Sequence, residues 1–308
     1  MHRRTLLRAL AAGAALLAAR PPIGFASERR LRAVATFSIL GDMLYRVGGD
    51  RIEMTTLVGP DGDAHVYQPT PADARHVAAA EVILVNGLGF EGWIDRLIAA
   101  SGFKGTVIIA STGVTPLTAD EEDGDDEKGH GHDAVDPHAW QSLDNGATYV
   151  GNIERGLIAA DPSGTDVYKA NAERYRAEMA ALNEEVRAAI GKLPSDRRTV
   201  VTSHEAFAYF GQAYGLRFLA PEGVSTDAEA SAKDVARLIR QIRQQRIPAV
   251  FMENISDPRL IERIREETGA VIGGALYSDA LSEPGGPAAS YLEMFRYNTR
   301  TLVAALGG

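Results

Sequence analysis

Three potential metal-binding side chains follow predicted strands that lie far apart in the chain. His65 comes shortly after the strand-like run 51–59, His204 directly follows the run 198–203, and Asp279 follows the run 270–278. In parallel α/β sheets, ligands bind outside the carboxyl ends of the strands. Because imidazole nitrogens and carboxylate oxygens both bind divalent cations, these positions predict one metal site that is shared by three loops.

His138 is a fourth candidate ligand, in the segment "DPHAW", where a proline turn and a tryptophan are expected to fix the backbone. Three imidazoles and one carboxylate suit Zn²⁺, which binds nitrogen at ~2.0–2.1 Å and prefers four tetrahedral ligands. Mn²⁺ is harder and prefers a larger share of oxygen ligands. A single loop histidine is more often a surface residue, and Asp279 alone is as often a helix cap. The comparable positions of all four favour a shared metal site, and their donor types favour zinc as its metal.

A second group of potential ligands lies in an acidic segment, residues 120–136, which holds nine acids and one lysine. Within it, His130 and His132 are one residue apart, and Asp133 is beside them. We expect these three residues to hold additional zinc weakly. Because the loop is tethered to His138, an ion held there would have a high effective concentration at the main site. The alternative is a solvated insertion with histidines by chance. The whole loop 113–136 is longer than compact domains usually contain.

The elements that position these residues alternate between strand and helix. Strands are predicted at 31–38, 51–59, 81–87 and 105–111, with helices at 39–49, 70–80 and 89–101. The pattern returns with strands at 198–203, 216–220, 248–254 and 270–278, and helices at 205–215, 228–246, 257–269 and 290–306. Such alternation predicts an α/β protein with two lobes, each a parallel sheet flanked by helices.

A long helix is predicted between the two lobes, from the cap Asp161 and Pro162 to Gly191. Its apolar stripe follows steps of four and three: Tyr168, Ala172, Tyr175, Met179, Leu182, Val186 and Ala189. A helix of this length spans roughly 40 Å, and we prefer a helix across its own protein to a coiled coil. The expected organisation is an N-terminal lobe over 27–160, a linking helix over 161–193 and a C-terminal lobe over 194–308.

The first 26 residues have the pattern of a cleaved secretory signal peptide, with a basic start, a short apolar run and small residues before the cut. The run is too short for a membrane span, and its paired arginines also resemble a twin-arginine signal, so the export route stays open. The chain holds no cysteine, which excludes disulfides, thiolate ligands and the residue that carries a lipoprotein anchor. We expect a freely diffusing periplasmic protein.

The charge of the chain is concentrated in one place. The formal net charge is −9, and loss of the four signal arginines would take it to −13, of which residues 120–136 contribute −8. This sign disfavours nucleic acid as a partner and favours cations. A content of 45% hydrophobic and 24% charged residues is ordinary for a globular protein.

Motifs along nearly the whole mature chain resemble the periplasmic metal-binding proteins of ABC importers, in the zinc and manganese cluster, with the AztC type as the nearest match. They are "GDAHVYQPTPADARHVAAAEVILVNGLGFEGWIDRL", "DPHAW", "TSHEAFAYFGQAYGL", "VFMEN" and "ALYSDAL". The resemblance implies His65, His138, His204 and Asp279 as ligands, whereas manganese members typically have Glu in place of His204. Two departures are Ala64, in place of a usual proline, and "WQSLD" after "DPHA".

The resemblance also implies the function and the partners. The protein is expected to be a monomer that binds one Zn(II) tightly, moves its lobes little and delivers the ion to an ABC permease in the inner membrane, without being embedded there. The loop is implied to be a docking element for a periplasmic zinc chaperone. The alternative within the family is a carrier of manganese or iron(II). Because ligand imidazoles must be neutral, affinity is expected to fall below pH ~6.5.

A zinc hydrolase is the rival from another class, since it would need three protein ligands and an open position for water. His204 and Glu205 begin like the motif H-E-x-x-H, but Ala208 stands where the second histidine would be. Four protein ligands leave no position for water, so we expect no enzyme activity. Glu205, beside His204, is the residue that could upset the zinc assignment; its alternative role is that of a solvent-facing residue in the first turn of a helix. His76 is assigned to a helix surface without function.

Overall fold

The computed structural model describes residues 29–118 and 135–307. The expected signal peptide, and the expected weak site at His130, His132 and Asp133, lie outside the described residues. Within the described residues, no helix has the length and apolar character needed to cross a membrane.

The N-terminal lobe contains a four-stranded sheet in the order β2-β1-β3-β4, in which all pairs are parallel. Its strands are β1 (Leu31–Phe37), β2 (Ile52–Val58), β3 (Val82–Val85) and β4 (Thr106–Ile109). The helices that accompany it are α1 (Ser38–Gly48), α2 (Pro71–Ala79), α3 (Ile94–Ser101) and α4 (Leu143–Ala160). Every residue of β3 is buried, as expected for a short apolar strand in the middle of a parallel sheet.

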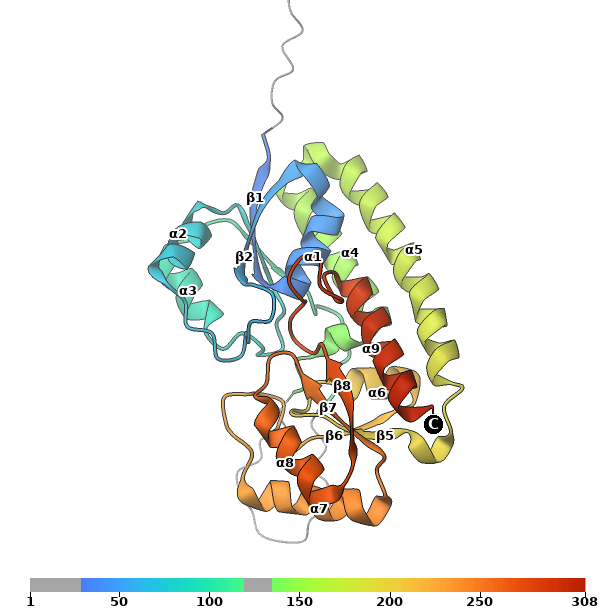
Figure 1. Ribbon diagram of the computed structural model, residues 1–308. Helices are drawn as coiled ribbons and strands as arrows, with labels where there is room; N and C mark the ends of the chain where they lie inside the picture. Colours follow the sequence, from blue (N-terminus) through green and yellow to red (C-terminus); the bar gives the residue numbers. More distant parts are fainter. Residues whose placement is uncertain (1–28, 119–134, 308) are drawn as a thin grey trace, which may run out of the picture.

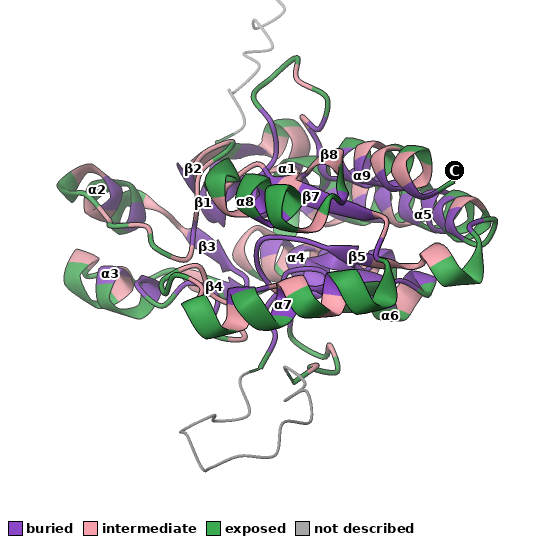
Figure 2. Cartoon of the chain, turned by 60° about the horizontal axis from the view of Figure 1, so that its bottom comes forward, coloured by how far each residue is buried: buried purple, intermediate pink, exposed green. Residues whose placement is uncertain are grey.

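The C-terminal lobe repeats this architecture with the parallel order β6-β5-β7-β8. Its strands are β5 (Thr199–Val201), β6 (Arg217–Leu219), β7 (Ala249–Glu253) and β8 (Val271–Leu276). The helices are α6 (Ala208–Tyr214), α7 (Ala232–Gln245), α8 (Pro258–Thr268) and α9 (Tyr291–Leu306). Helices α7 and α8 turn an exposed face outward (Figure 2), and β5 lies buried behind them. The predicted fold class, two α/β lobes with parallel sheets, is confirmed.

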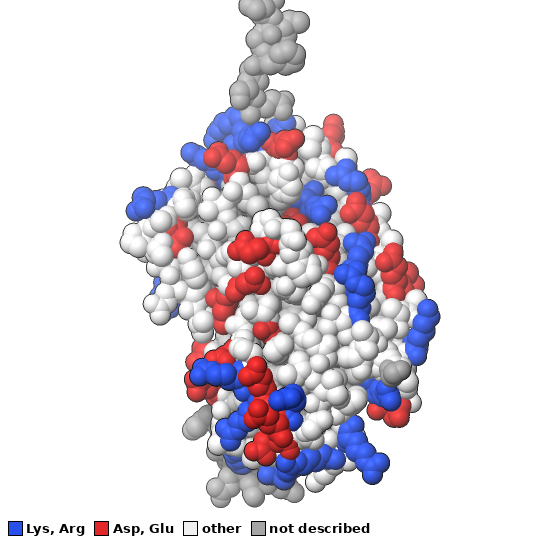
Figure 3. Space-filling view, viewed as in Figure 1, with Lys and Arg blue, Asp and Glu red and all other residues white. Residues whose placement is uncertain are grey.

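The linking helix α5 (Thr165–Ile190) runs along one edge of both lobes (Figure 1). A 3₁₀ turn, Pro162–Gly164, precedes it, so the helix begins at Thr165 and the prediction of a start at Asp161 was wrong. The predicted stripe is buried from Tyr168 to Val186, although Ala189 is only half-buried and Ile190 ends the stripe. Figure 3 shows charges of both signs interspersed along the outer edge that α5 forms.

The larger of two hydrophobic clusters spans both lobes. It includes strands of the N-terminal sheet, helices α4, α5, α6 and α9, and strand residues of the C-terminal sheet such as Phe251 and Leu276. A second, smaller cluster lies beneath α7 and α8. Because interiors are closely packed, a continuous core resists movement of one lobe against the other.

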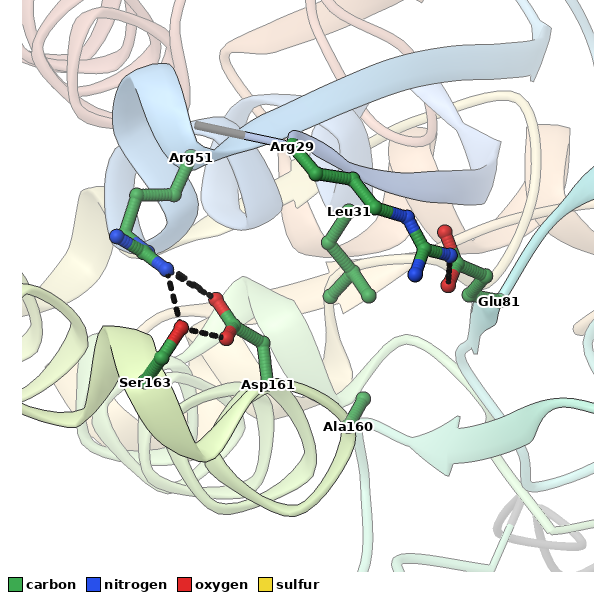
Figure 4. A pocket seen from close by; sticks show the side chains of 7 residues that line it. All are labelled: Arg29, Leu31, Arg51, Glu81, Ala160, Asp161 and Ser163. Atoms are coloured by element: carbon green, nitrogen blue, oxygen red, sulfur yellow. Dashed lines mark hydrogen bonds and ion pairs between the residues drawn. The ribbon is translucent and has the colours of Figure 1, made fainter. Parts of the chain in front are cut away.

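A charged cluster fastens the start of the linking segment to the N-terminal lobe (Figure 4). Arg51, beside the first residue of β2, donates through Nη2 to Asp161 Oδ2 at 2.9 Å and to Ser163 Oγ at 2.7 Å. Nearby, Arg29 pairs with Glu81, and together these residues line a pocket at the amino ends of the strands. This pocket lies at the end of the sheet opposite to the candidate ligands.

Candidate metal centre

The four predicted ligands lie together between the lobes. His65 is in the loop between β2 and α2, and His138 precedes the 3₁₀ turn Ala139–Gln141. His204 and Asp279 each lie three residues beyond a strand, β5 and β8. One nitrogen or oxygen of each residue lies within 4.8 Å of those of the other three. The carboxyl ends of both sheets therefore face one point.

The spacing of these atoms fits a small cation. His65 Nε2 lies 3.3 Å from His138 Nε2 and 3.2 Å from Asp279 Oδ2. Asp279 Oδ1 lies 3.5 Å from His138 Nε2, and Asp279 Oδ2 lies 3.1 Å from His204 Nε2. In a tetrahedral zinc site with bonds of ~2.0–2.1 Å, neighbouring ligand atoms are about 3.3–3.4 Å apart. Four of the six pairs among these groups thus have about the separation that such a site requires.

The candidate ligands are almost completely removed from solvent. His138, His204 and Asp279 are 0% exposed, and the side chain of His65 is 3% exposed. Phe90 and Trp140 pack against the ring of His138, with centroids 5.9 and 5.2 Å away. A buried carboxylate among imidazoles is costly without a compensating cation or proton. The burial therefore favours retention of an ion over exchange with water.

Two further carboxylates orient the imidazoles from behind. Asp136 Oδ1 lies 2.7 Å from His138 Nδ1 and also accepts the backbone N–H of His138. Glu253 Oε2 lies 2.8 Å from His204 Nδ1. A carboxylate at Nδ1 keeps the proton on that nitrogen, which leaves the lone pair of Nε2 for a metal. Both Nε2 atoms then point to the same side, where Asp279 lies.

The charges of the site alter its protonation. Burial opposes protonation of His138, but the Asp279 carboxylate and the hydrogen bond to Asp136 outweigh it and raise the pKa of His138 to about 9. Burial likewise opposes protonation of His204, yet Glu253 and Asp279 raise its pKa well above the ordinary value. Burial alone would raise the pKa of Asp279, but these two histidines outweigh it and hold that pKa well below its usual range. Protons therefore compete with a metal ion for these rings at neutral pH, and we expect metal affinity to begin to fall at a higher pH than ~6.5.

The loop that carries His65 is held by its neighbours in both lobes. Asp63 Oδ1 accepts the backbone N–H of His65 at 2.9 Å, and Asp63 Oδ2 accepts from Thr226 Oγ1 of the C-terminal lobe at 2.6 Å. The buried indole of Trp93 donates from Nε1 to the carbonyl of Ala64 at 2.8 Å. These bonds fix the peptide between Ala64 and His65, next to the position where the family that the sequence resembles usually has proline.

The segment that carries His138 is held by a buried network. Asn86 Nδ2 donates to the carbonyl of Pro137 at 2.9 Å, and Tyr149 donates its hydroxyl to Asn86 Oδ1 at 2.6 Å. The backbone N–H of Asn86 donates to Glu91, and burial raises the pKa of that carboxyl. From the other lobe, Tyr209 donates to the carbonyl of Asp136 at 3.2 Å. Each of the two peptides before His138 is therefore fixed by a side chain, one from each lobe.

Other sequence predictions about individual residues had different outcomes. His76 lies exposed on α2, as predicted. Glu205 lies in a bend before α6, so its placement in a helical first turn was wrong; the helix begins only at Ala208. Asp136 and Glu253 were not assigned a role from the sequence. The sequence does contain a sign of each role: Asp136 lies two residues before His138, and Glu253 lies at the end of a predicted strand.

Comparison with known proteins identifies the family. The family described as "Zinc-uptake complex component A periplasmic" matches residues 33–305. The manganese-binding lipoprotein MntA of Halalkalibacterium halodurans is 33% identical over 276 residues, 90% of this chain and 88% of that protein. The iron-binding protein YfeA of Yersinia pestis is 30% identical over 281 residues, 91% of this chain and 88% of that protein.

Solved structures show the same fold. The Mn-bound periplasmic metal binding protein from Candidatus Liberibacter asiaticus aligns with a TM-score of 0.80 and 31% identity, covering 90% of this chain and 100% of that one. The periplasmic zinc binding protein TroA from Treponema pallidum aligns with a TM-score of 0.82 and 29% identity, covering 90% and 99%. This chain therefore belongs to the zinc-uptake component A family, whose members are not enzymes but the metal-binding proteins of ABC importers, acting with a permease and an ATPase.

Proposed function

We propose that this protein captures periplasmic Zn(II) and delivers it to an ABC importer. The observation that carries the metal assignment is the donor set: three Nε2 atoms and one carboxylate, four of whose mutual distances are 3.1–3.5 Å. Nitrogen-rich tetrahedral sites suit zinc better than manganese. In this proposal His65, His138, His204 and Asp279 are the ligands of one tightly bound ion, held between a lobe of residues 27–160 and a lobe of residues 194–308.

Transport of manganese or iron is the second candidate, because relatives with about 30% identity bear names that specify those metals. The ligand set argues against it, since a harder ion prefers more oxygen. Mn-bound and Cd-bound structures of the protein from Candidatus Liberibacter asiaticus show that a single relative can hold different ions. Selectivity between these ions is therefore the property that separates the two candidates.

A competition titration tests the metal assignment. The purified mature protein is stripped of metal, and Zn²⁺, Mn²⁺ and, without oxygen, Fe²⁺ compete for it. We expect one tightly bound Zn²⁺ per chain, which Mn²⁺ does not displace at comparable concentration. His138→Ala should lose at least about 100-fold in zinc affinity. The matched control is His76→Ala, which removes an exposed imidazole on α2 and should change nothing. Displacement of zinc by manganese at comparable concentration would assign the second candidate instead.

We also propose that the acidic loop gathers zinc for this site. In the sequence, nine acids precede or flank His130 and His132, and the described ends of the loop pair with each other at Thr118 and Val135, close to His138 in the chain. Docking of a periplasmic zinc chaperone on this loop is part of the same proposal. Replacement of His130 and His132 by alanine should remove weak zinc binding and slow transfer from a zinc donor, with unchanged affinity at the main site. Unchanged transfer would refute it.

Export and release into the periplasm complete the proposal, with the protein acting as a monomer. The manganese-binding relative MntA of Halalkalibacterium halodurans is named a lipoprotein. The present sequence holds no cysteine, so it lacks the residue on which such an anchor is built. The first 26 residues are proposed as a cleaved signal peptide. Recovery of the protein in the periplasmic fraction, with a mature N-terminus after Ala26, is the expected result, and recovery only with membranes would contradict it.

A further inference from the structure

The turn before His65 is bonded to the opposite lobe through Asp61. The backbone N–H of Asp61 donates to the carbonyl of Leu281 at 2.9 Å, and its carboxylate oxygen Oδ1 accepts from Asn254 Nδ2 at 2.9 Å. Leu281 lies two residues after Asp279, and Asp61 lies four residues before His65. These two bonds therefore connect the segments of two candidate ligands across the gap between the lobes.

Asn254 extends this connection to the segment of a third ligand. Its Nδ2 also donates to the carbonyl of Ala280 at 3.3 Å, and its backbone N–H donates to the carbonyl of Leu276 at 3.1 Å. Asn254 directly follows Glu253, whose carboxylate lies 2.8 Å from His204 Nδ1. The side-chain amide of Asn254 thus contacts Asp61, in the segment before His65, and Ala280, next to Asp279. The preceding residue, Glu253, orients His204.

The backbone of Asp61 is strained in a way that this connection explains. Residues 59–62 form a four-residue turn, in which the backbone N–H of Gly62 donates to the carbonyl of Gly59 at 3.3 Å. Pro60 is the second residue of this turn, and Asp61, the third, has a φ of 51°. A turn with proline second and positive φ third favours glycine or asparagine there. Strained non-glycine residues persist where the surroundings hold them, often at functional sites. Aspartate supplies the carboxylate that glycine lacks.

The position of the bond suits a contact that opens and closes. The side chain of Asp61 is exposed, whereas the candidate ligands are buried. Water can therefore replace Asn254 as the partner of Asp61 without unfolding of either lobe. Once that bond is broken, the segment that leads to His65 loses one of its bonds to the C-terminal lobe, and His65 is the least buried of the four candidate ligands.

We propose that Asp61 is a positioning residue that slows release of the metal, by tying the His65 segment to Asn254 and Leu281 of the other lobe. This inference rests on the proposed function. Asp61 does not contact the ion, so its effect is expected on the rate at which metal leaves and not on which metal binds.

The test uses the variant Asp61→Gly, because glycine adopts a positive φ without strain and removes only the carboxylate. Arg246→Gly is the matched control: Arg246 has a φ of 53° at the end of α7, is exposed, and lies away from the ligand segments. The rate of zinc release from the loaded full-length mature protein is measured by stopped flow with excess chelator. The melting temperature, Tm, is measured on the metal-free forms.

Asp61→Gly should release zinc about fivefold faster, the factor that corresponds to one net hydrogen bond. Its metal-free Tm should equal or exceed that of the parent, which a merely structural role would not give. Arg246→Gly should raise Tm and leave release unchanged. Asn254→Ala should also accelerate release, and the double variant should be no faster than the faster single variant. A release rate within twofold of the parent for Asp61→Gly, or equal acceleration by Arg246→Gly, would overturn the inference. A parent that takes up no metal would overturn the proposed function together with it.

Discussion

Glu253 lies behind His204, with Oε2 2.8 Å from the Nδ1 atom of the imidazole, while Nε2 of the same ring lies 3.1 Å from Asp279. The other oxygen of Glu253 accepts the backbone N–H groups of Ser203 and His204, at 2.7 and 3.0 Å. The acid at the end of β7 thus fixes both the backbone and the ring of a candidate ligand that belongs to β5. This arrangement makes the tautomer of His204 part of the metal site.

Glu253→Gln should weaken zinc binding by roughly 10–100-fold. An amide whose oxygen keeps the backbone bonds turns its NH₂ group toward Nδ1, so the ring must place its proton on Nε2, where metal would bind. Isothermal titration with a competing chelator measures the loss. Glu262→Gln on the exposed face of α8 is the control and should bind zinc like the parent. Equal affinity of both variants would show that Glu253 does not set the tautomer.

Metal affinity should rise with pH until the pH exceeds about 9. Burial opposes the charge on His138, but Asp279 and Asp136 outweigh it and raise its pKa to about 9, so the proton must leave before the metal binds at neutral pH. The pKa of His204 is also raised, and roughly one to two protons should be released per ion at pH 7. Titrations in buffers of different ionisation enthalpy count these protons. Binding without proton release at pH 7 would be inconsistent with this electrostatic picture.

The same raised pKa has the opposite consequence for the metal-free fold. Because the folded pKa of His138 lies above the unfolded value near 6.5, the stabilisation from its protonated form is complete below pH ~6.5 and is lost as pH rises through about 9. Urea unfolding of the metal-free protein should therefore show a fall in stability across this range. Loaded protein should not show it. A flat profile for the metal-free protein would contradict the prediction.

Trp93→Phe should weaken metal binding although Trp93 does not reach the ion. The variant leaves the buried carbonyl of Ala64 without its donor, which costs about 1–3 kcal/mol and loosens the residue before His65. Both the Tm of the metal-free protein and the zinc affinity should fall. Lower stability with unchanged affinity would mean that Asp63 alone fixes the His65 loop.

Asp161→Asn should lower the free energy of unfolding at pH 7 by about 1–2 kcal/mol. Burial acts against ionisation, but bonds from Ser163, Tyr168 and Arg51 lower the pKa of Asp161 to about 2. The carboxylate is partly exposed, so the full shift is not converted into stability. This contribution is present above pH ~3.8 and disappears as pH falls through about 2, so parent and variant should converge in acid. Asp227→Asn, on an exposed loop, serves as control, and equal losses in both variants would refute the role of Asp161.

The four candidate ligands could be predicted from the sequence because each lies just beyond a recognisable strand or motif. Strand ends in parallel sheets have a known direction, so the pattern of strands also fixes where their loops meet. The orientation of the rings could not be predicted in this way. Glu253 is forty-nine residues from His204, and only the pairing of β5 with β7 shows that the two are neighbours.

Helix α4 was missed for a physical reason. Its sequence contains Gly146, Gly151 and Gly156, and glycine lowers helix propensity by about 1 kcal/mol each. In the folded protein a Cβ at Gly146 would lie 2.6 Å from the hydroxyl of Tyr291, and one at Gly156 would lie 2.2 Å from Ile108. Close packing against α9 and β4 therefore requires the residues that weaken the local signal. Tertiary contacts, which periodicity does not report, stabilise this helix.

X-ray absorption at the zinc and manganese edges tests the central proposal most directly. Metal-free protein is loaded from an equimolar mixture of Zn²⁺ and Mn²⁺, and unbound metal is removed. We predict one zinc per chain, with four nitrogen or oxygen neighbours at ~2.0–2.1 Å, imidazole scattering from three rings and no bound water. Retained manganese, or a six-coordinate shell rich in oxygen, would contradict a closed zinc site formed by three histidines and one aspartate.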